Sequence, residues 1–325
     1  MAQRSGTPPP SEPAGDAAPT GDAAPTVLGV AEPPTAESLP APSRALVPVP
    51  AEAAPVAAPE PYAGHRRSDV DGWGRSEHMR GILRRVYDPV YKYWFRAEVE
   101  GLEHLPAEGG ALLVSNHAGA VPSDAPVIMH AIETETGRAV YGLAENLFRA
   151  MPVVGTLWSR VGGVAANPDN AYRLLHDQDQ LVLVFPEGTK GTGKHYSQRY
   201  QLRRFGRGGF VEIAMRSGVP VVPVAVVGSE EAMPIIWKSP RLAKLLGIPY
   251  LPVTANMLVF GPLGVVAPFP AKFRVRVLEP VTFGVPPDQE RYSRSQVMEA
   301  SESIRTRIQV ALYEMLRDRR SPWFG

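Results

Sequence analysis

The feature that most constrains this sequence is a series of short apolar runs, each ending in a polar or glycine-containing turn. Ala111–Val114 stops at Ser115–Asn116, and Leu181–Phe185 runs directly into Pro186–Gly188. Continuous apolar runs of this length are typical of strands that are covered on both faces. Stretches with helical spacing alternate with them, so the sequence predicts an α/β fold.

A third apolar run, Val219–Val227, contains Pro220 and Pro223. Because proline cannot donate to the strand ladder, the two prolines predict a sheet edge or a bulged entry. Ile248–Pro270 is apolar but rich in proline and glycine, and we expect a hydrophobic rim or lid there. The periodicity predicts further strands over 96–99, 139–144 and 274–278, and helices over 125–133, 170–177, 208–216 and 295–317.

The first 75 residues are expected to form a disordered tail. Fifteen of the 35 prolines fall between Pro8 and Pro61, the hexapeptide Gly-Asp-Ala-Ala-Pro-Thr occurs twice in tandem, and no aromatic residue precedes Tyr62. Such a composition cannot bury enough apolar surface to fold. The remaining residues 76–325, about 250 in number, suit a single α/β domain.

The overall charge and the absence of cysteine limit the function classes. A net charge of +1 gives no electrostatic case for nucleic acid, and zero cysteines exclude disulfides and thiolate metal sites. No signal peptide is evident, and no apolar stretch reaches the roughly 18–20 residues that span a bilayer. We therefore expect a cytoplasmic protein without a cofactor, peripheral on the cytoplasmic face of a membrane if it binds one.

The first segment after the tail, Ser76–Arg96, predicts an amphipathic helix with a break near Pro89. Its apolar residues follow helical spacing, and arginine and lysine occupy other positions. A helix of this kind can lie on anionic lipid, or it can dock on its own domain. The sequence leaves both interpretations open.

His117 is the leading candidate for a catalytic base. It lies just past a predicted strand end, where open α/β sheets place their chemistry, and Gly119 and Pro122 allow the following loop to turn back toward Asp124. A carboxylate that orients an imidazole makes it a general base for a hydroxyl. The alternative interpretation is that His117 caps a turn and Asp124 caps the helix that follows.

Other candidates follow the remaining strand ends. Glu187 and Gly188 would emerge beside His117 if their strands are parallel, and a phosphate could be held by basic residues, of which Arg160 is favoured because its surroundings are apolar. Gly188–Lys194 has the spacing of a P-loop, but His195 stands where serine or threonine must bind magnesium. The basic residues in question are Arg160, Lys190, Lys194, Arg203, Arg204 and Arg207.

Four blocks, taken together, resemble the glycerolipid acyltransferase family, which includes the lysophosphatidic acid acyltransferases. They are Asn116-His117…Asp124, Gly155…Arg160, Phe185-Pro-Glu-Gly-Thr189 and Val219-Pro-Val-Val-Pro-Val224. The family usually has four residues between the histidine and the aspartate, whereas this chain has six. The longer loop, with Phe205–Phe210 and Gly228–Glu231, looks more like a subgroup related to diacylglycerol acyltransferases and phytyl ester synthases.

The resemblance implies a central mixed, largely parallel sheet flanked by helices, and an O-acyltransferase of glycerolipid biosynthesis. Acyl-CoA or acyl-carrier protein would donate the acyl group, and His117 with Asp124 would activate a lipid hydroxyl. A glycerolipid such as lysophosphatidic acid is the expected acceptor; neutral lipid alcohols, or a non-catalytic lipid-binding role, are the alternatives. The residues that the resemblance assigns to substrate binding are Asn116, Arg160, Glu187, Gly188, Thr189, Lys190 and Arg207.

Overall fold

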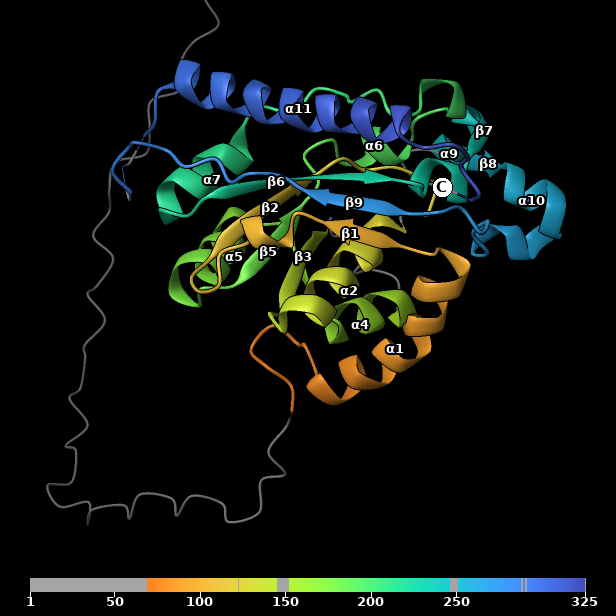
Figure 1. Cartoon of the computed structure of the whole chain (residues 1–325), viewed down its shortest axis with the longest axis horizontal. Helices are drawn as coiled ribbons and strands as arrows, with labels where there is room; N and C mark the ends of the chain where they lie inside the picture. Colours follow the sequence, from red (N-terminus) through yellow and green to blue (C-terminus); the bar gives the residue numbers. More distant parts are fainter. Residues whose placement is uncertain are drawn as a thin grey trace, which may run out of the picture. The chain divides into compact units, whose positions relative to one another are not determined.

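The computed structural model, drawn in Figure 1, describes residues 69–121, 123–144, 152–245, 251–287, 289 and 291–324. Most of the tail expected over 1–75 therefore lies outside the described residues, as does Pro122 of the loop between His117 and Asp124. Residues 145–151, which precede Arg160 in the sequence, are also outside them.

The core of the fold is a seven-stranded sheet with the order β1-β9-β6-β2-β5-β3-β4. Strands β6, β2, β5, β3 and β4 are parallel, β9 is antiparallel to β6, and β1 is parallel to β9. The sheet is thus mixed and largely parallel, as the resemblance implied. Its strands are β1 (Glu98–Glu100), β2 (Ala111–Ser115), β3 (Val140–Ala144), β4 (Gly163–Ala165), β5 (Leu181–Val184), β6 (Val221–Val227) and β9 (Arg274–Val277).

Helices cover both faces of this sheet, with α7 and α11 on one face and α1, α2 and α4 on the other (Figure 1). Alternate residues of the buried strands serve the two layers: Leu112 and Val114 pack in the cluster with α7 and α11, and Leu113 packs in the cluster with α2. The helices are α1 (Glu77–Pro89), α2 (Asp124–Thr136), α4 (Pro152–Arg160), α5 (Pro168–Tyr172), α7 (Gly209–Ser217) and α11 (Arg294–Arg317).

Shorter elements connect this framework. Several of them follow the strands at one edge of the sheet, and a second, two-stranded sheet pairs β7 with β8. They are the helical turns η1 (Val90–Trp94), η2 (Leu102–His104), η3 (Arg173–Asp177), η4 (Tyr196–Gln198) and η5 (Gly261–Val265), the helices α6 (Thr189–Thr192), α8 (Ser229–Ala232), α9 (Pro240–Leu245) and α10 (Ala255–Phe260), and the strands β7 (Ile235–Lys238) and β8 (Pro252–Thr254).

Of the two arrangements that the prolines predicted for β6, the sheet edge is wrong, because the strand lies between β9 and β2. Pro220 precedes the strand, and Pro223 lies within it. Val221 exchanges both backbone hydrogen bonds with Val281, so alternate residues, Pro223 among them, direct their nitrogen toward the β9 side. Strand β9 pairs with β6 from Val224 onward, and the separate bridge to Val281 lies at Val221. Pro223 lies between these two pairings, where no backbone N–H from β6 is required.

The helix expected over Ser76–Arg96 is observed as α1, which continues into the π-helical turn η1. The side chain of Ser76 accepts a hydrogen bond from Met79 N and caps the helix. No helix in the described part of the chain is long and apolar enough to cross a bilayer.

The loops that follow the parallel strands β5, β2 and β6 all lie at one edge of the sheet. In the register of β2 with its neighbours, Val114 lies opposite Val184 of β5 and Ser115 lies opposite Val224 of β6. The chain therefore leaves all three strands on the same side, and this edge holds His117, Glu187 and the residues after Val227.

Candidate active site

His117 and Asp124 form the contact on which the site is built. His117 Nδ1 lies 2.9 Å from Asp124 Oδ2, and Asp124 is the first residue of α2. The same carboxylate accepts hydrogen bonds from Ala118 N, at 2.9 Å, and from Ala125 N, at 2.8 Å. Because a carboxylate can only accept, ring Nδ1 carries the proton and Nε2 is left as the basic nitrogen.

The six residues between the histidine and the aspartate are compatible with this contact because other segments hold the loop. Ser229 Oγ donates to Ala118 O at 2.7 Å, and Ala120 N donates to Met233 O at 3.2 Å. Gly119 has a φ of +84°, and a Cβ there would lie 2.9 Å from Ser229 O. The loop after β6 thus fixes the loop after β2.

The imidazole of His117 is held in place but remains accessible. Its ring stacks on Phe185, with ring centroids 4.1 Å apart and an interplanar angle of 20°. The side chain is 14% exposed, whereas that of Asp124 is fully buried. A base that is oriented by a buried acid and open to solvent on one side can take a proton from a bound hydroxyl.

Glu187 lies beside His117, but its carboxylate points into the protein. Oε2 accepts from His117 N at 3.2 Å, Oε1 accepts from Arg203 N at 2.6 Å, and Lys194 Nζ lies 3.4 Å from Oε1. The side chain has no exposed surface. Glu187 therefore joins the loops after β2 and β5 and positions the backbone of the base.

The residues after Glu187 pass close to the base. Gly188 adopts φ 53° and ψ −145° and precedes α6, in which Thr189 is half-buried and Lys190 is exposed. In the same helix, a Cβ on Gly191 would lie 2.7 Å from His117 O and 2.8 Å from Glu187 Cβ. Gly191 is a site residue that sequence reasoning missed, and the glycine-rich run around it was the available signal.

The side chains of two other candidates, Asn116 and Arg160, form hydrogen bonds with the backbone of the domain. The Asn116 amide donates to Val226 O at 2.9 Å and accepts from Val226 N at 2.8 Å, so it extends the pairing of β2 with β6 through a side chain. Arg160 ends α4 immediately before β4, and its Nη1 donates to Gly74 O at 3.2 Å. Since β4 is parallel to β3, Arg160 lies at the edge opposite His117.

Arg207, the last candidate, is exposed in the turn before α7. In that turn, Gly208 packs against Val297 of α11. The role of Arg207 in substrate binding stays a prediction.

A buried charged network, which sequence reasoning missed, lies behind Glu187. Lys194 Nζ lies 3.4 Å from Glu230 Oε1 as well as from Glu187, so the lysine of the P-loop-like run is enclosed between two carboxylates. Glu230 also accepts from Tyr200 N at 2.9 Å. Burial raises the pKa of Glu230 to about 7, with Lys194 opposing the shift.

The network continues to the end of α11. Tyr200 donates from its hydroxyl to Glu231, which also pairs with Arg319 at 2.5 Å. Burial raises the pKa of Tyr200 well above its usual value, and Glu231 adds to the shift. This network ties the segment after Glu187 to α8 and the C-terminal residues.

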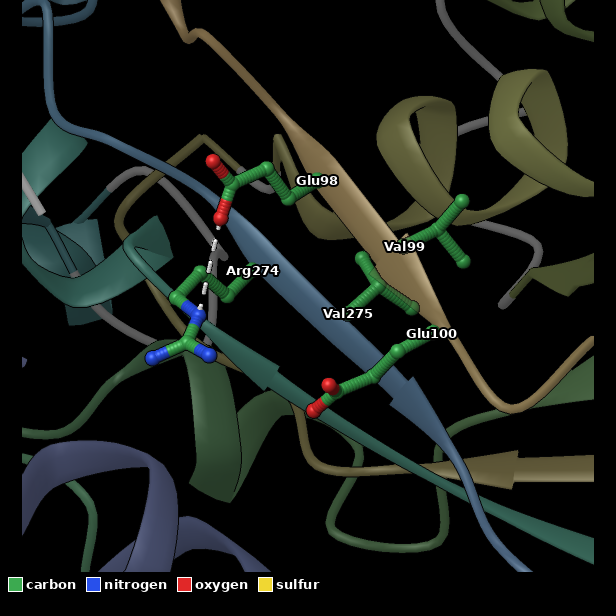
Figure 2. Close-up of a pocket in the computed structure, with 5 residues that line it drawn as sticks. All are labelled: Glu98, Val99, Glu100, Arg274 and Val275. Atoms are coloured by element: carbon green, nitrogen blue, oxygen red, sulfur yellow. Dashed lines mark ion pairs between the residues drawn. The ribbon is translucent and has the colours of Figure 1, made fainter. Parts of the chain in front are cut away.

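A surface depression lies elsewhere, along β1 and β9 (Figure 2). Glu98, Glu100 and Arg274 line it, and Arg274 Nε lies 3.8 Å from Glu98 Oε2. Glu98 also pairs with Lys272 at 2.6 Å, and Glu100 pairs with Arg276 at 2.5 Å, so both carboxylates are occupied by cations. Among the described residues, no group of three histidine, aspartate or glutamate side chains is arranged to hold a metal ion.

Comparison with known proteins identifies a family to which this chain is similar. A family model described as Acyltransferase matches residues 96–227. An uncharacterized protein of Mycobacterium tuberculosis (strain ATCC 25618 / H37Rv) is 38% identical over 259 residues, which cover 79% of this chain and 72% of that protein.

Two more distant relatives have described functions. Phytyl ester synthase 2, chloroplastic, of Arabidopsis thaliana is 31% identical over 148 residues, which are 43% of this chain and 21% of that protein. A 1-acyl-sn-glycerol-3-phosphate acyltransferase of Limnanthes alba is 27% identical over 185 residues, which are 54% of this chain and 57% of that protein.

Proposed function

This chain belongs to the acyltransferase family, and on that premise we propose that it transfers a fatty acyl group from a thioester donor to a lipid hydroxyl. The donor would be acyl-CoA or acyl-carrier protein. The observation that carries the proposal is the 2.9 Å contact between His117 Nδ1 and Asp124 Oδ2, at the edge where three parallel strands end.

The proposed reaction needs only this pair. His117 Nε2 removes the proton of the acceptor hydroxyl while the oxygen attacks the thioester carbonyl, and Asp124 stabilises the imidazolium that forms. The carbon–sulfur bond then breaks, the thiolate leaves with the electron pair, and it takes up the proton that His117 holds. The products are an ester and a free thiol. The step needs no cysteine, and the chain has none.

We propose a glycerolipid such as lysophosphatidic acid as the acceptor, which would place the enzyme in glycerolipid biosynthesis at a membrane surface. The relative from Limnanthes alba is named for such a reaction. Lys190 is exposed in α6, whose Gly191 packs against His117, and we propose that it binds the acceptor phosphate.

A specific observation favours a second candidate, transfer to a neutral lipid alcohol. Arg160, the residue that the resemblance assigned to phosphate, lies at the opposite edge of the sheet, and Lys194 is enclosed by carboxylates. The relative from Arabidopsis thaliana is named as a phytyl ester synthase. An acceptor without phosphate would need neither cation.

The two candidates are separated by incubating the full chain with radiolabelled oleoyl-CoA and a panel of acceptors. The panel contains lysophosphatidic acid, monoacylglycerol, diacylglycerol and a long-chain alcohol, and the readout is labelled ester. His117→Ala should reduce turnover by roughly a thousandfold or more, without a change in the unfolding temperature. His176→Ala, which removes an exposed imidazole, is the matched control. Wild-type activity in a folded His117→Ala variant would exclude the proposed mechanism, and no turnover of any acceptor would favour a non-catalytic lipid-binding protein.

A further inference from the structure

The segment between β8 and β9 exposes an unusual amount of apolar surface. Leu258 is 74% exposed, Leu263 is 71% exposed and Val266 is 68% exposed. Asn256, the only buried residue of α10, donates from Nδ2 to Ala232 O and Ala267 O, each at 2.9 Å. The polar side chain thus anchors the segment and the apolar side chains face outward. We call the exposed group the apolar lobe: Leu258, Val259, Phe260, Leu263, Val265 and Val266.

Aromatic residues from the C-terminus extend the apolar lobe. Phe269 lies 5.7 Å from Phe260 and 6.2 Å from Trp323, measured between ring centroids. The next residue, Phe324, is 86% exposed. Trp94 donates from Nε1 to Pro268 O at 3.1 Å, which brings η1 to the same surface. Figure 1 shows α10 projecting at one end of the domain, beyond the strands.

The stretch of sequence that contains the apolar lobe carries basic residues and no acidic ones. Although the whole chain carries 34 basic and 33 acidic residues, the stretch 232–278 contains no aspartate or glutamate. Arg241 and Lys244, in the helix before the lobe, are exposed. A second copy docked by a two-fold axis would place this positive surface against itself, which opposes self-association. Lys272, Arg274 and Arg276, at the far end of the stretch, pair with Glu98, Glu100 and Glu314. The positive surface beside the lobe is therefore formed by Lys238, Arg241 and Lys244, all of them exposed.

We propose that the apolar lobe inserts into the interface of an anionic phospholipid bilayer, with the neighbouring basic residues on the headgroups. Exposed leucine, valine and phenylalanine, flanked by tryptophan and by cations, are the combination that binds such an interface. The inference rests on the proposed function, and it names the surface that approaches the membrane. It differs from the expectation for Ser76–Arg96, because α1 also packs on the domain through Tyr87 and contributes fewer exposed apolar residues.

The apolar lobe is directly connected to the loop of the catalytic base. Asn256 binds the carbonyl of Ala232, and the adjacent Met233 accepts a hydrogen bond from Ala120 in the loop between His117 and Asp124. Insertion of the apolar lobe would therefore bring this loop to the membrane surface, where a lipid hydroxyl is found.

Flotation of the full chain with phosphatidylcholine vesicles, with and without phosphatidylglycerol, tests the proposal. The double variant Leu258→Asp, Leu263→Asp should bind the anionic vesicles about tenfold more weakly or worse. The matched control is Val310→Asp, Tyr313→Asp, which charges exposed apolar positions on α11 and should float like the wild type. A third variant, Ile82→Asp, Val86→Asp, places the same change on α1.

Unchanged flotation of the Leu258→Asp, Leu263→Asp variant would overturn the proposal, whatever the α1 variant does. A wild-type dimer that this variant converts to a monomer in sedimentation would also overturn it, in favour of a second copy on the lobe. Unfolding temperatures establish that each variant is folded. Flotation needs no turnover, so His117→Ala should bind vesicles like the wild type, and failure of the catalytic proposal remains distinguishable from failure of this one.

Discussion

The backbone N–H of His117 donates to the buried carboxylate of Glu187 at 3.2 Å, so the glutamate of the Phe-Pro-Glu-Gly-Thr block supports the base from within. The resemblance suggested instead that Glu187 binds the acceptor. Its carboxylate already accepts from two backbone donors and pairs with Lys194. We therefore propose that Glu187 acts as a positioning group, and the next variant tests this against direct binding of the acceptor.

Glu187→Gln should therefore lower stability as well as activity. The amide has one acceptor oxygen in place of two and leaves Lys194 with a weakened partner, so we expect a loss of about 2–4 kcal/mol in the free energy of unfolding. Denaturant unfolding and steady-state kinetics measure both effects. A variant with wild-type stability and only a raised KM for the acceptor would restore the direct binding role.

Asp124→Asn should leave the fold largely intact and reduce turnover by roughly a hundredfold or more, because an amide neither fixes the Nδ1–H tautomer nor stabilises the imidazolium. The asparagine oxygen can still accept from one of the two backbone donors, Ala118 N or Ala125 N. Turnover measured across neutral pH, with circular dichroism as the check on folding, tests this. A mild effect on turnover would show that the dyad is not used.

Gly191→Ala should disturb the base without touching a functional group. The added methyl would meet His117 O at 2.7 Å and Glu187 Cβ at 2.8 Å, and we expect a cost of about 1–3 kcal/mol together with reduced turnover. Gly209→Ala is the matched control, because a Cβ at that position meets nothing within 4 Å. Equal behaviour of the two variants would contradict the close packing of α6 on His117.

Glu230 should make stability depend on pH. Its pKa is raised to about 7 in the folded chain, above the value of 4.5 for a free carboxyl, so the folded state binds the proton more tightly. The resulting contribution is fully present below about pH 4.5 and is lost as the pH rises through 7, with a slope of at most about 1.4 kcal/mol per pH unit.

The measurement is denaturant unfolding of the wild type and of Glu230→Gln between pH 5 and about pH 8. The wild type should lose stability relative to the variant over this interval, because only the wild type releases the Glu230 proton. Parallel curves for the two proteins would mean that Glu230 does not titrate there.

Buried apolar runs made the strands predictable, since β2 and β5 lie within one residue of the expected ranges. For β6 the prolines indicated a sheet edge or a bulged entry; the strand lies inside the sheet, and its pairing with β9 is interrupted at Pro223. The sequence shows that a proline has no backbone N–H to donate. It does not show whether the neighbouring strand presents an acceptor at that position.

The contacts of the site were predictable where they join residues close in sequence, and not where they join distant segments. His117 and Asp124 are separated by one loop, and their contact followed from that loop. The position of Arg160 depends on which end of β4 it precedes, and this requires the strand direction. The pairing of Lys194 with Glu230 requires the knowledge that two residues distant in sequence are buried together. Lone charged residues in a sequence are more often found on the surface.

The direction of β9 has a geometric consequence for substrate delivery. Because this strand runs against β6, Arg274 at its start pairs with Val227 at the end of β6. The residues that precede β9 consequently lie at the same edge of the sheet as the imidazole of His117. If β9 ran in the other direction, the exposed apolar surface of α10 would lie at the opposite edge of the sheet. A lipid bound there would then be separated from His117 by the whole length of the strands.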